Sequence, residues 1–269
     1  EKLHVDFRFP RARWIGFPLT DSQGRPMDYF GIPRNDVGEF GYAIEHPLAE
    51  VSSIAEMEAY PYWPTVDMWD YDQYAEECAR FEEYAVYGGA WGWFFDAACD
   101  LVGMERWFLM LYDNPELAHA ILGKITDWMA GYSEIMFQKA GKYIDICFTA
   151  DDYGFQRGPM MNQSMFDEFV RPYAQRIYDV GRRHGKLIMQ HSCGSVAAWI
   201  PSFLEMGLNI LEPVQVGAAG MDPRKLAAQW GGKLCFHGSI DTQRTLPFGT
   251  PDDVRREVRE RVETFRPYG

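Results

Sequence analysis

Short apolar runs alternate with longer amphipathic segments from about residue 80 onward. Each apolar run ends at a polar or glycine-rich turn, which is typical of a buried strand. The longer segments repeat their apolar positions with the period of a helix, and some begin at a capping residue followed by proline or end at glycine, as at Asn114-Pro115 and Gly185. We predict strands over 84–87, 144–148, 187–190, 208–211 and 234–237, and helices over 113–140, 162–184, 196–206, 222–230 and 250–265.

This alternation predicts a parallel sheet with crossover helices, either an open doubly wound sheet or a closed (β/α)8 barrel. No predicted strand is followed by G-x-G-x-x-G or by a phosphate-binding loop, which disfavours the nucleotide-binding forms. Polar residues follow four of the strands, and in a barrel they would all lie at the carboxyl-terminal face, where barrel enzymes build their sites. We therefore predict a (β/α)8 TIM barrel, with residues 1–269 as one domain and the aromatic-rich residues 10–80 as an irregular excursion over the barrel mouth.

The motif His191-Ser192-Cys193 directly follows the predicted strand 187–190. Because alternate residues of a strand point the same way, the strand end can aim His191 and Cys193 at one point. Imidazole nitrogen and thiolate sulfur are both preferred ligands of zinc, although a catalytic zinc usually has three protein ligands. Cys235 and His237 have the same spacing at the end of a later predicted strand, so they either supply a further ligand or pack within the sheet. The alternative for the first motif is a turn with a buried thiol.

Carboxylates form a second candidate group. Asp151 and Asp152 follow a strand together, and two carboxylates held close are suited to general acid–base chemistry. The alternative is that one of them caps a turn or pairs with Arg157. Asp241 follows the last predicted strand and is either catalytic or a turn or helix cap.

Composition narrows the class of partner. The net charge of −13 and the pI of about 4.9 disfavour nucleic acid and anionic membrane surfaces as partners. Five scattered cysteines suit reduced thiols, so we expect a cytoplasmic protein. Aromatic residues make up 16% of the chain, and the cluster around Trp91 belongs either to the core or to the wall of a pocket for a flat or apolar substrate.

Four ordered motifs carry a family resemblance: residues 148–160 (FTADDYGFQRGPM), 191–195 (HSCGS), 212–215 (EPVQ) and 236–243 (FHGSIDTQ). Together they resemble the uroporphyrinogen decarboxylase superfamily, most closely its corrinoid-linked methyltransferases. The resemblance implies a (β/α)8 barrel whose His191 and Cys193 bind zinc with a further cysteine near the C-terminus. It also implies a corrinoid carried on a partner protein, a small-molecule thiol or methoxylated substrate, and pairing as a homodimer.

The remaining site residues are assigned on the same grounds. We expect Asp151, Asp152 and Asp241 to be catalytic, and the following residues to contact substrate: Trp91, Tyr153, Gln156, Glu212, Gln215 and His237.

Departures from the family keep other functions open. The decarboxylases have an arginine-rich N-terminal motif, whereas Arg11 and Arg13 stand in a different context, and Asp96 lies near the place of a substrate-binding tyrosine. Relatives have an additional opening strand and an eighth strand, so we expect about six of eight barrel strands here and a third metal ligand beyond Gly269. The alternatives are a cofactor-free decarboxylase, a demethylase using another acceptor, and a non-catalytic ligand-binding barrel.

Overall fold

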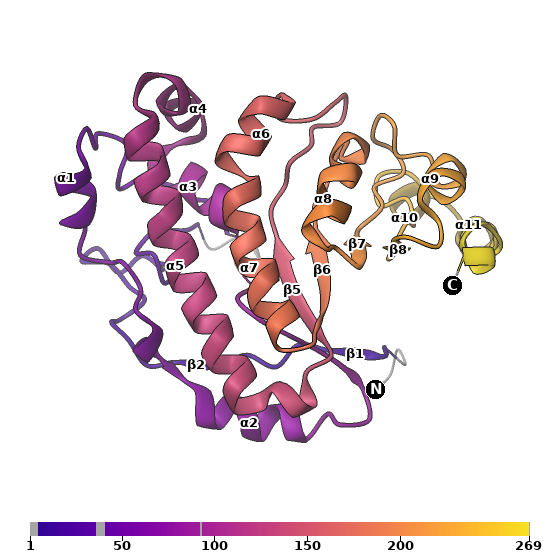
Figure 1. Cartoon of the computed structure of the whole chain (residues 1–269), viewed down its shortest axis with the longest axis horizontal. Coiled ribbons are helices and arrows are strands. Elements are labelled where there is room, and N and C mark those ends of the chain that lie inside the picture. The colour runs from indigo at the N-terminus through magenta and orange to yellow at the C-terminus, as the bar shows by residue number, and fades with distance from the viewer. Residues whose placement is uncertain (1–4, 36–40, 92, 269) are drawn as a thin grey trace. The chain divides into compact units, whose positions relative to one another are not determined.

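The computed structural model describes residues 5–35, 41–91 and 93–268 (Figure 1). The chain forms two compact units, residues 1–145 and residues 146–269. Among the described helices, none is both long and apolar enough to cross a membrane. The candidate site lies in the second unit, so the first is described only briefly. The prediction of a single domain stays a prediction.

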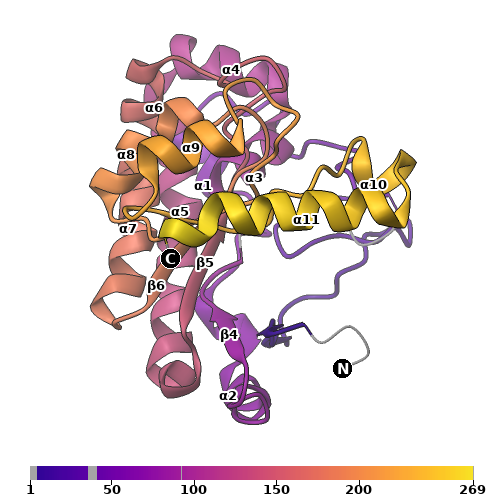
Figure 2. The same ribbon diagram turned by 90° about the vertical axis from the view of Figure 1, so that its right-hand side faces the viewer.

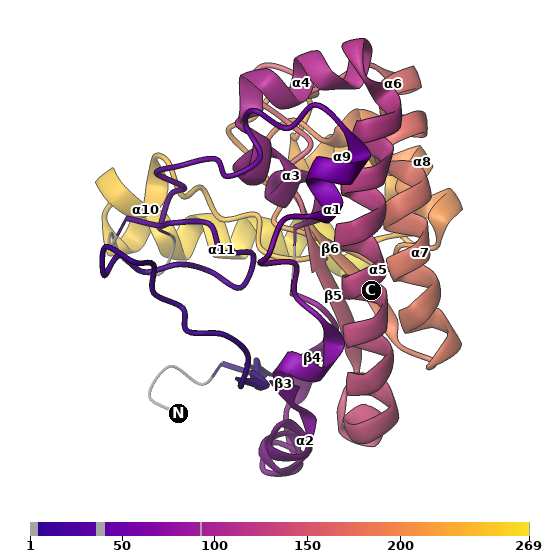
Figure 3. The ribbon, with the colours of Figure 1, turned by 90° about the vertical axis from the view of Figure 1, so that its left-hand side faces the viewer.

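The first unit combines two strand pairs with a helical layer. Strand β1 (Phe7–Arg8) pairs in parallel with β4 (Ala85–Gly88), and β2 (Arg13–Trp14) pairs antiparallel with β3 (Trp69–Asp70). The long helix α5 packs against its neighbours α2, α3 and α4 (Figure 3). The helical bounds are α1 (Ile54–Glu58), η1 (Val66–Met68), α2 (Tyr71–Ala79), α3 (Phe94–Val102), α4 (Met104–Asp113), α5 (Pro115–Ala140) and η2 (Gly141–Tyr143).

Aromatic rings from residues 10–80 form much of the core of this unit. The ring of Trp69 lies 4.6 Å from Trp14 and 5.3 Å from Trp128 of α5, centre to centre. Tyr29 lies 5.2 Å from the same Trp128 ring. This aromatic cluster therefore joins the short elements of residues 10–80 to α5. That these residues cross a barrel mouth stays a prediction.

The second unit is a parallel sheet with helices packed on it. Its strands are β5 (Ile146–Ala150), β6 (Leu187–His191), β7 (Ile210–Glu212) and β8 (Cys235–Phe236), paired in that order. Helix α7 packs on β5 and β6 (Figure 1), and α11 lies against α9 (Figure 2). The helical bounds are α6 (Gln163–Phe169), α7 (Arg171–Arg183), η3 (Ala197–Trp199), α8 (Ile200–Met206), α9 (Pro223–Trp230), α10 (Thr245–Phe248), α11 (Pro251–Phe265) and η4 (Arg266–Tyr268).

A glycine allows α7 to approach the sheet closely. A Cβ placed on Gly181 would lie 2.6 Å from side-chain carbons of both Cys147 and Ile188. No larger residue fits there without displacing a strand, because such a distance is far inside van der Waals contact. The sequence thus sets the spacing between this helix and strands β5 and β6, and with it the position of the strand ends that carry the site.

Two helical segments differ from the prediction for local reasons. The predicted helix 162–184 is two helices, α6 and α7, that meet at Val170. Pro172 explains the break, because proline lacks the N–H that would continue the hydrogen-bond ladder and its ring clashes with the preceding turn. Helix α3 was not predicted, since only Asp96 and Asp100 interrupt its apolar run, and a short apolar run does not by itself distinguish a helix from a buried strand.

Six strands of the described residues pair in parallel, two in the first unit and four in the second. Each of these strands is followed by one or more helices before the next parallel strand or the end of the described residues. This is the repeating unit of a (β/α)8 barrel, with six of its eight strands. The predicted fold class and strand number agree with this arrangement.

Candidate metal centre

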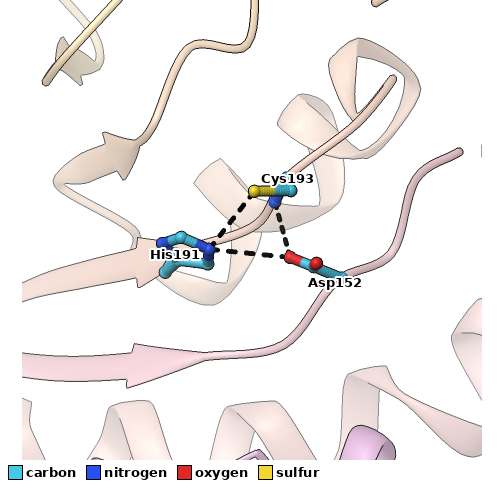
Figure 4. A group of neighbouring side chains, drawn as sticks. All are labelled: Asp152, His191 and Cys193. Atoms are coloured by element: carbon cyan, nitrogen blue, oxygen red, sulfur yellow. Dashed lines mark hydrogen bonds and ion pairs between the residues drawn. The ribbon is translucent and has the colours of Figure 1, made fainter. Parts of the chain in front are cut away.

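Strand register brings three candidate residues to one place. His191 is the last residue of β6 and lies opposite Ala150 of β5 and Glu212 of β7. Asp152 comes two residues after Ala150, so it falls on the same side of the sheet as His191. Figure 4 shows the side chains of Asp152, His191 and Cys193 turned toward one another. The carboxyl ends of β5 and β6 thus bring the three groups together.

The distances within this cluster match those of a metal site. Cys193 Sγ lies 3.5 Å from His191 Nε2, and Asp152 Oδ1 lies 3.6 Å from the same nitrogen. The three ligand atoms all lie within 4.8 Å of one another. In a tetrahedral zinc site, bond lengths of about 2.0 Å to nitrogen and 2.3 Å to sulfur place those two ligand atoms roughly 3.5 Å apart. The donor set and its spacing therefore fit zinc.

Glu212 orients the imidazole. Its Oε2 lies 2.6 Å from His191 Nδ1, so Nδ1 carries the proton that the carboxylate accepts. In the neutral imidazole this leaves the lone pair on Nε2, which faces Cys193 and Asp152. Burial alone lowers the pKa of His191, but hydrogen bonds to Cys193 and Glu212 outweigh it and raise the pKa to about 10. A carboxylate behind a ligating histidine is a common arrangement in metal sites.

Three hydrogen bonds hold the loop that carries Cys193. The backbone N–H of Cys193 donates to Asp152 Oδ1 at 2.7 Å, and that of Gly194 donates to Gln215 Oε1 at 2.6 Å. Ser195 N donates to Phe155 O at 2.9 Å. Gly194 has a φ of 82°, and a Cβ there would lie 2.0 Å from Gly154 O. The close backbone approach and the left-handed conformation together exclude a side chain at this position.

Asp151 and Asp152 have different partners. Asp152 faces Cys193, whereas Asp151 is buried and its Oδ2 accepts a hydrogen bond of 3.2 Å from Tyr153 OH. Successive residues of an extended segment point to opposite sides, which separates the two carboxylates. Tyr153 is fully buried and its carbonyl accepts from Trp199 Nε1 at 3.1 Å. The catalytic role of Asp151 and the substrate contact of Tyr153 stay predictions.

The remaining candidates lie in several places. Asp241 Oδ1 accepts from the backbone N–H groups of Gln243 and Arg244 at 2.8 and 2.9 Å, which is the turn-capping arrangement named as its alternative. Gln156 is exposed in the loop after β5, and His237 directly follows β8. The described metal-ligand cluster includes neither Cys235 nor His237.

Trp91 belongs to the first unit. Its ring centre lies 4.2 Å from that of Phe9, and the Arg11 guanidinium lies 5.3 Å from it. Its predicted contact with substrate is not tested by these neighbours.

Sequence reasoning placed Asp152 among the catalytic residues and did not foresee it as a donor beside His191. The available signal was that Asp152 lies two residues after Ala150, the strand residue that pairs with His191. Using that signal requires the register between β5 and β6, which the sequence alone does not give. The part played by Gly154 and Gly194 in the close approach of the two loops was also missed. The available signal for this close approach was the presence of one glycine in each of the two strand-end motifs.

Comparison with known proteins identifies the family. A family model described as uroporphyrinogen decarboxylase (URO-D) matches residues 79–268, well over half of the chain. The chain belongs to the uroporphyrinogen decarboxylase family. A structural likeness agrees: a methyltransferase from Methanosarcina mazei matches with a TM-score of 0.63 at 17% identity, over 88% of this chain and 67% of that chain. The predicted family and barrel fold are therefore confirmed.

The family contains relatives with different activities. A uroporphyrinogen decarboxylase from Alcanivorax borkumensis is 24% identical over 58% of this chain and 41% of its own length. A methylated-thiol–coenzyme M methyltransferase from Methanosarcina mazei is 24% identical over 62% of this chain and 42% of its own. The chain thus spans about two fifths of the length of these curated relatives. Sequence similarity at this level does not distinguish decarboxylation from methyl transfer. The choice between these two activities therefore depends on the residues of the site.

Proposed function

We propose that this chain is a zinc-dependent methyltransferase or demethylase, which moves a methyl group between a corrinoid and a small-molecule thiol or methoxylated compound. One observation carries the proposal: an imidazole nitrogen, a thiol sulfur and a carboxylate oxygen lie within 4.8 Å of one another at adjacent strand ends. Glu212 behind His191 supports the same conclusion. A relative of similar identity is a methyltransferase for methylated thiols.

The residues present have separate tasks in this scheme. His191, Cys193 and Asp152 would hold the metal, and Glu212 would keep the His191 lone pair turned toward it. When bound, zinc would deprotonate a coordinated thiol, so that it serves as a nucleophile at neutral pH. Gln215 accepts from Gly194 N and so holds the backbone beside Cys193. With three protein donors, a fourth position is left for the substrate, as catalytic zinc sites require.

The proposal extends to partner and compartment. The corrinoid would be carried on a separate partner protein that presents its methyl group at the carboxyl ends of β5–β7. The acidic net charge of −13 suits neither nucleic acid nor an anionic membrane as that partner. We place the protein in the cytoplasm on its five scattered cysteines, and as a homodimer on the family resemblance.

A methyl-transfer assay tests the function directly. The zinc-loaded chain is mixed with free methylcobalamin and a panel of small thiols, and loss of the methyl-corrinoid absorbance is followed. We expect methyl transfer to require both zinc and thiol. Cys193→Ala should abolish the transfer. Cys235→Ala, which removes an exposed thiol of the same unit, should leave the rate unchanged. A rate independent of zinc, or unchanged in Cys193→Ala, would contradict the proposal.

Glu212 offers a graded test of the metal site. We expect Glu212→Gln to weaken zinc about tenfold and Glu212→Ala up to about a hundredfold, the range typical when the partner of a ligating histidine is removed. Glutamine keeps an acceptor for the Nδ1 proton but loses the charge, whereas alanine frees the ring. Competition with a chromogenic chelator measures both affinities. Equal zinc affinity in wild type and Glu212→Ala would show that His191 does not bind through Nε2.

Decarboxylation is the second candidate, because two uroporphyrinogen decarboxylases are among the relatives, at 24% and 22% identity. In that case Asp152 would act as a carboxylate at a site that needs no metal. Release of carbon dioxide from a uroporphyrinogen by the metal-free chain separates the two functions. We expect none, since Asp152 lies beside His191 and Cys193 as a third donor.

A further inference from the structure

Helix α11 turns a charged pair inward and apolar residues outward. Among the residues of α11, all of which the structure describes, only Glu257 is buried. It pairs with Arg261 through a 2.7 Å contact, and the Arg261 side chain is 19% exposed. On the same helix Val258 and Val262 are 42% and 56% exposed. These two valines are thus more exposed than the charged pair, although Phe265 of the same helix packs with its ring centre 5.2 Å from that of Phe236 in β8.

The pair is poorly suited to stabilising the fold. Glu257 Oε2 is buried and has no hydrogen-bond partner among the described residues. A buried ion pair generally gains less from mutual attraction than its desolvation costs, and apolar residues of similar volume often replace it without loss of stability. An unsatisfied carboxylate oxygen adds to that cost. The burial of this pair is therefore weak evidence for a stabilising role.

Both members of the pair hold the loop that follows β8. Glu257 Oε1 accepts from Asp241 N at 3.0 Å, and Arg261 Nε donates to Ser239 O at 2.8 Å. Ser239 is the one non-glycine among the described residues with a positive φ, 62°, and it follows Gly238 at 87°. A left-handed serine persists only where its surroundings enforce that conformation. Glu257 and Arg261 supply this constraint from both sides of the turn.

This loop lies against the loop that positions Cys193. Val214 N donates to His237 O at 3.3 Å, and a Cβ on Gly217 would lie 3.2 Å from Gln243 Oε1. Between these two contacts lies Gln215, whose Oε1 accepts from Gly194 N. A continuous series of contacts therefore leads from α11 through loop 238–243 and loop 213–217 to the residue beside Cys193.

We infer that Glu257 and Arg261 are positioning residues, which set the conformation of loop 238–243 and through it the placement of Cys193 in the donor cluster. The effect of the pair on the conformation of the two loops applies to the metal-free protein. Its effect on zinc affinity rests on the proposed function. The series of contacts makes coupling between α11 and Cys193 physically possible. To demonstrate the coupling, a change on α11 must alter a measured property of the segment around Cys193.

The decisive variant is Glu257→Leu/Arg261→Met, which replaces the pair with apolar residues of similar size. Hydrogen–deuterium exchange of the metal-free chain is measured over segments 236–244 and 191–195. We expect exchange at least about fivefold faster in both segments with the thermal midpoint nearly unchanged, since replacing such a pair is commonly neutral for stability. Zinc affinity, measured by chelator competition, should fall about tenfold. A merely structural pair would change the midpoint and leave segment 191–195 as protected as before.

Controls keep the outcomes separate. Arg255→Met removes an exposed ion pair with Asp252 on the same helix and should alter neither segment. If the double variant does not fold, Glu257→Gln keeps an acceptor for Asp241 N, loses the charge toward Arg261, and should show a smaller increase in exchange. Unchanged exchange in segment 191–195 of a folded variant overturns the inference. Absence of zinc binding in the wild-type chain would count against the proposed function alone, because the exchange measurement uses metal-free protein.

Discussion

Replacing His191 and Cys193 together by alanine is expected to reduce bound zinc from close to one per chain to a trace. Structural zinc sites with four ligands bind with about 10–16 kcal/mol, which is roughly 3 kcal/mol for each ligand. Losing two of the three donors therefore weakens zinc by about 6 kcal/mol, on the order of ten-thousandfold in affinity. Elemental analysis of protein purified without added metal measures the zinc content directly.

Two controls make this measurement specific. Cys235→Ala removes a thiol that is exposed and outside the donor cluster, and should leave the zinc content unchanged. Circular dichroism of the double variant should match the wild type, because His191 and Cys193 are only partly buried and little core packing is lost. Zinc retained at one per chain in the double variant would place the metal elsewhere. A wild-type chain that binds no zinc would leave the decarboxylase and ligand-binding alternatives.

Trp199→Ala is expected to lower the free energy of unfolding by about 3–5 kcal/mol, the range for removing a large aromatic side chain from a core. Trp199 is 2% exposed, and its ring stacks on Phe166 with centres 4.4 Å apart and planes 10° from parallel. Its Nε1 also donates to Tyr153 O, so alanine leaves a buried carbonyl without this donor. Urea denaturation followed by far-ultraviolet circular dichroism measures the loss.

Trp199→Phe is the matched variant. It keeps an aromatic ring against Phe166 and removes the hydrogen bond to Tyr153, so we expect a loss of only about 1–2 kcal/mol. Because Tyr153 directly follows Asp152, the two variants also report on the link between core packing and the donor cluster. Equal stability of Trp199→Ala and wild type would mean that the stack with Phe166 contributes nothing to the fold.

Local sequence signals predicted the elements that local chemistry controls. Asn114 caps α5 by accepting from Leu117 N, with Pro115 in the first turn, as the sequence indicates. Asp222 caps α9 in the same way. Apolar runs bounded by polar turns located the cores of β4 to β8, since a buried strand needs apolar residues on both faces. The His191-x-Cys193 spacing predicted that both side chains converge, because a strand end has a period of two.

Partners distant in sequence were decided by the tertiary structure. Which of Asp151 and Asp152 faces His191 depends on the register of β5 against β6, and a shift of one residue would exchange them. The sequence is equally compatible with Asp241 as a catalytic acid and as a turn cap. The structure shows that its carboxylate accepts from the backbone N–H groups of Gln243 and Arg244.

Helix α11 shows most clearly the difference between what the sequence predicts and what tertiary packing decides. Its charge pattern alone predicts a solvated face, yet the packing of the loop after β8 draws Glu257 and Arg261 inward. The sequence by itself determined the alternation of strands and helices, their capping residues and the zinc-type motif, because each depends on neighbours within a few residues. Only the tertiary structure decided that Asp152 lies beside His191 and Cys193, that Glu212 pairs with the imidazole, and that the α11 pair is buried, because strand register and loop packing join residues that are far apart in the chain.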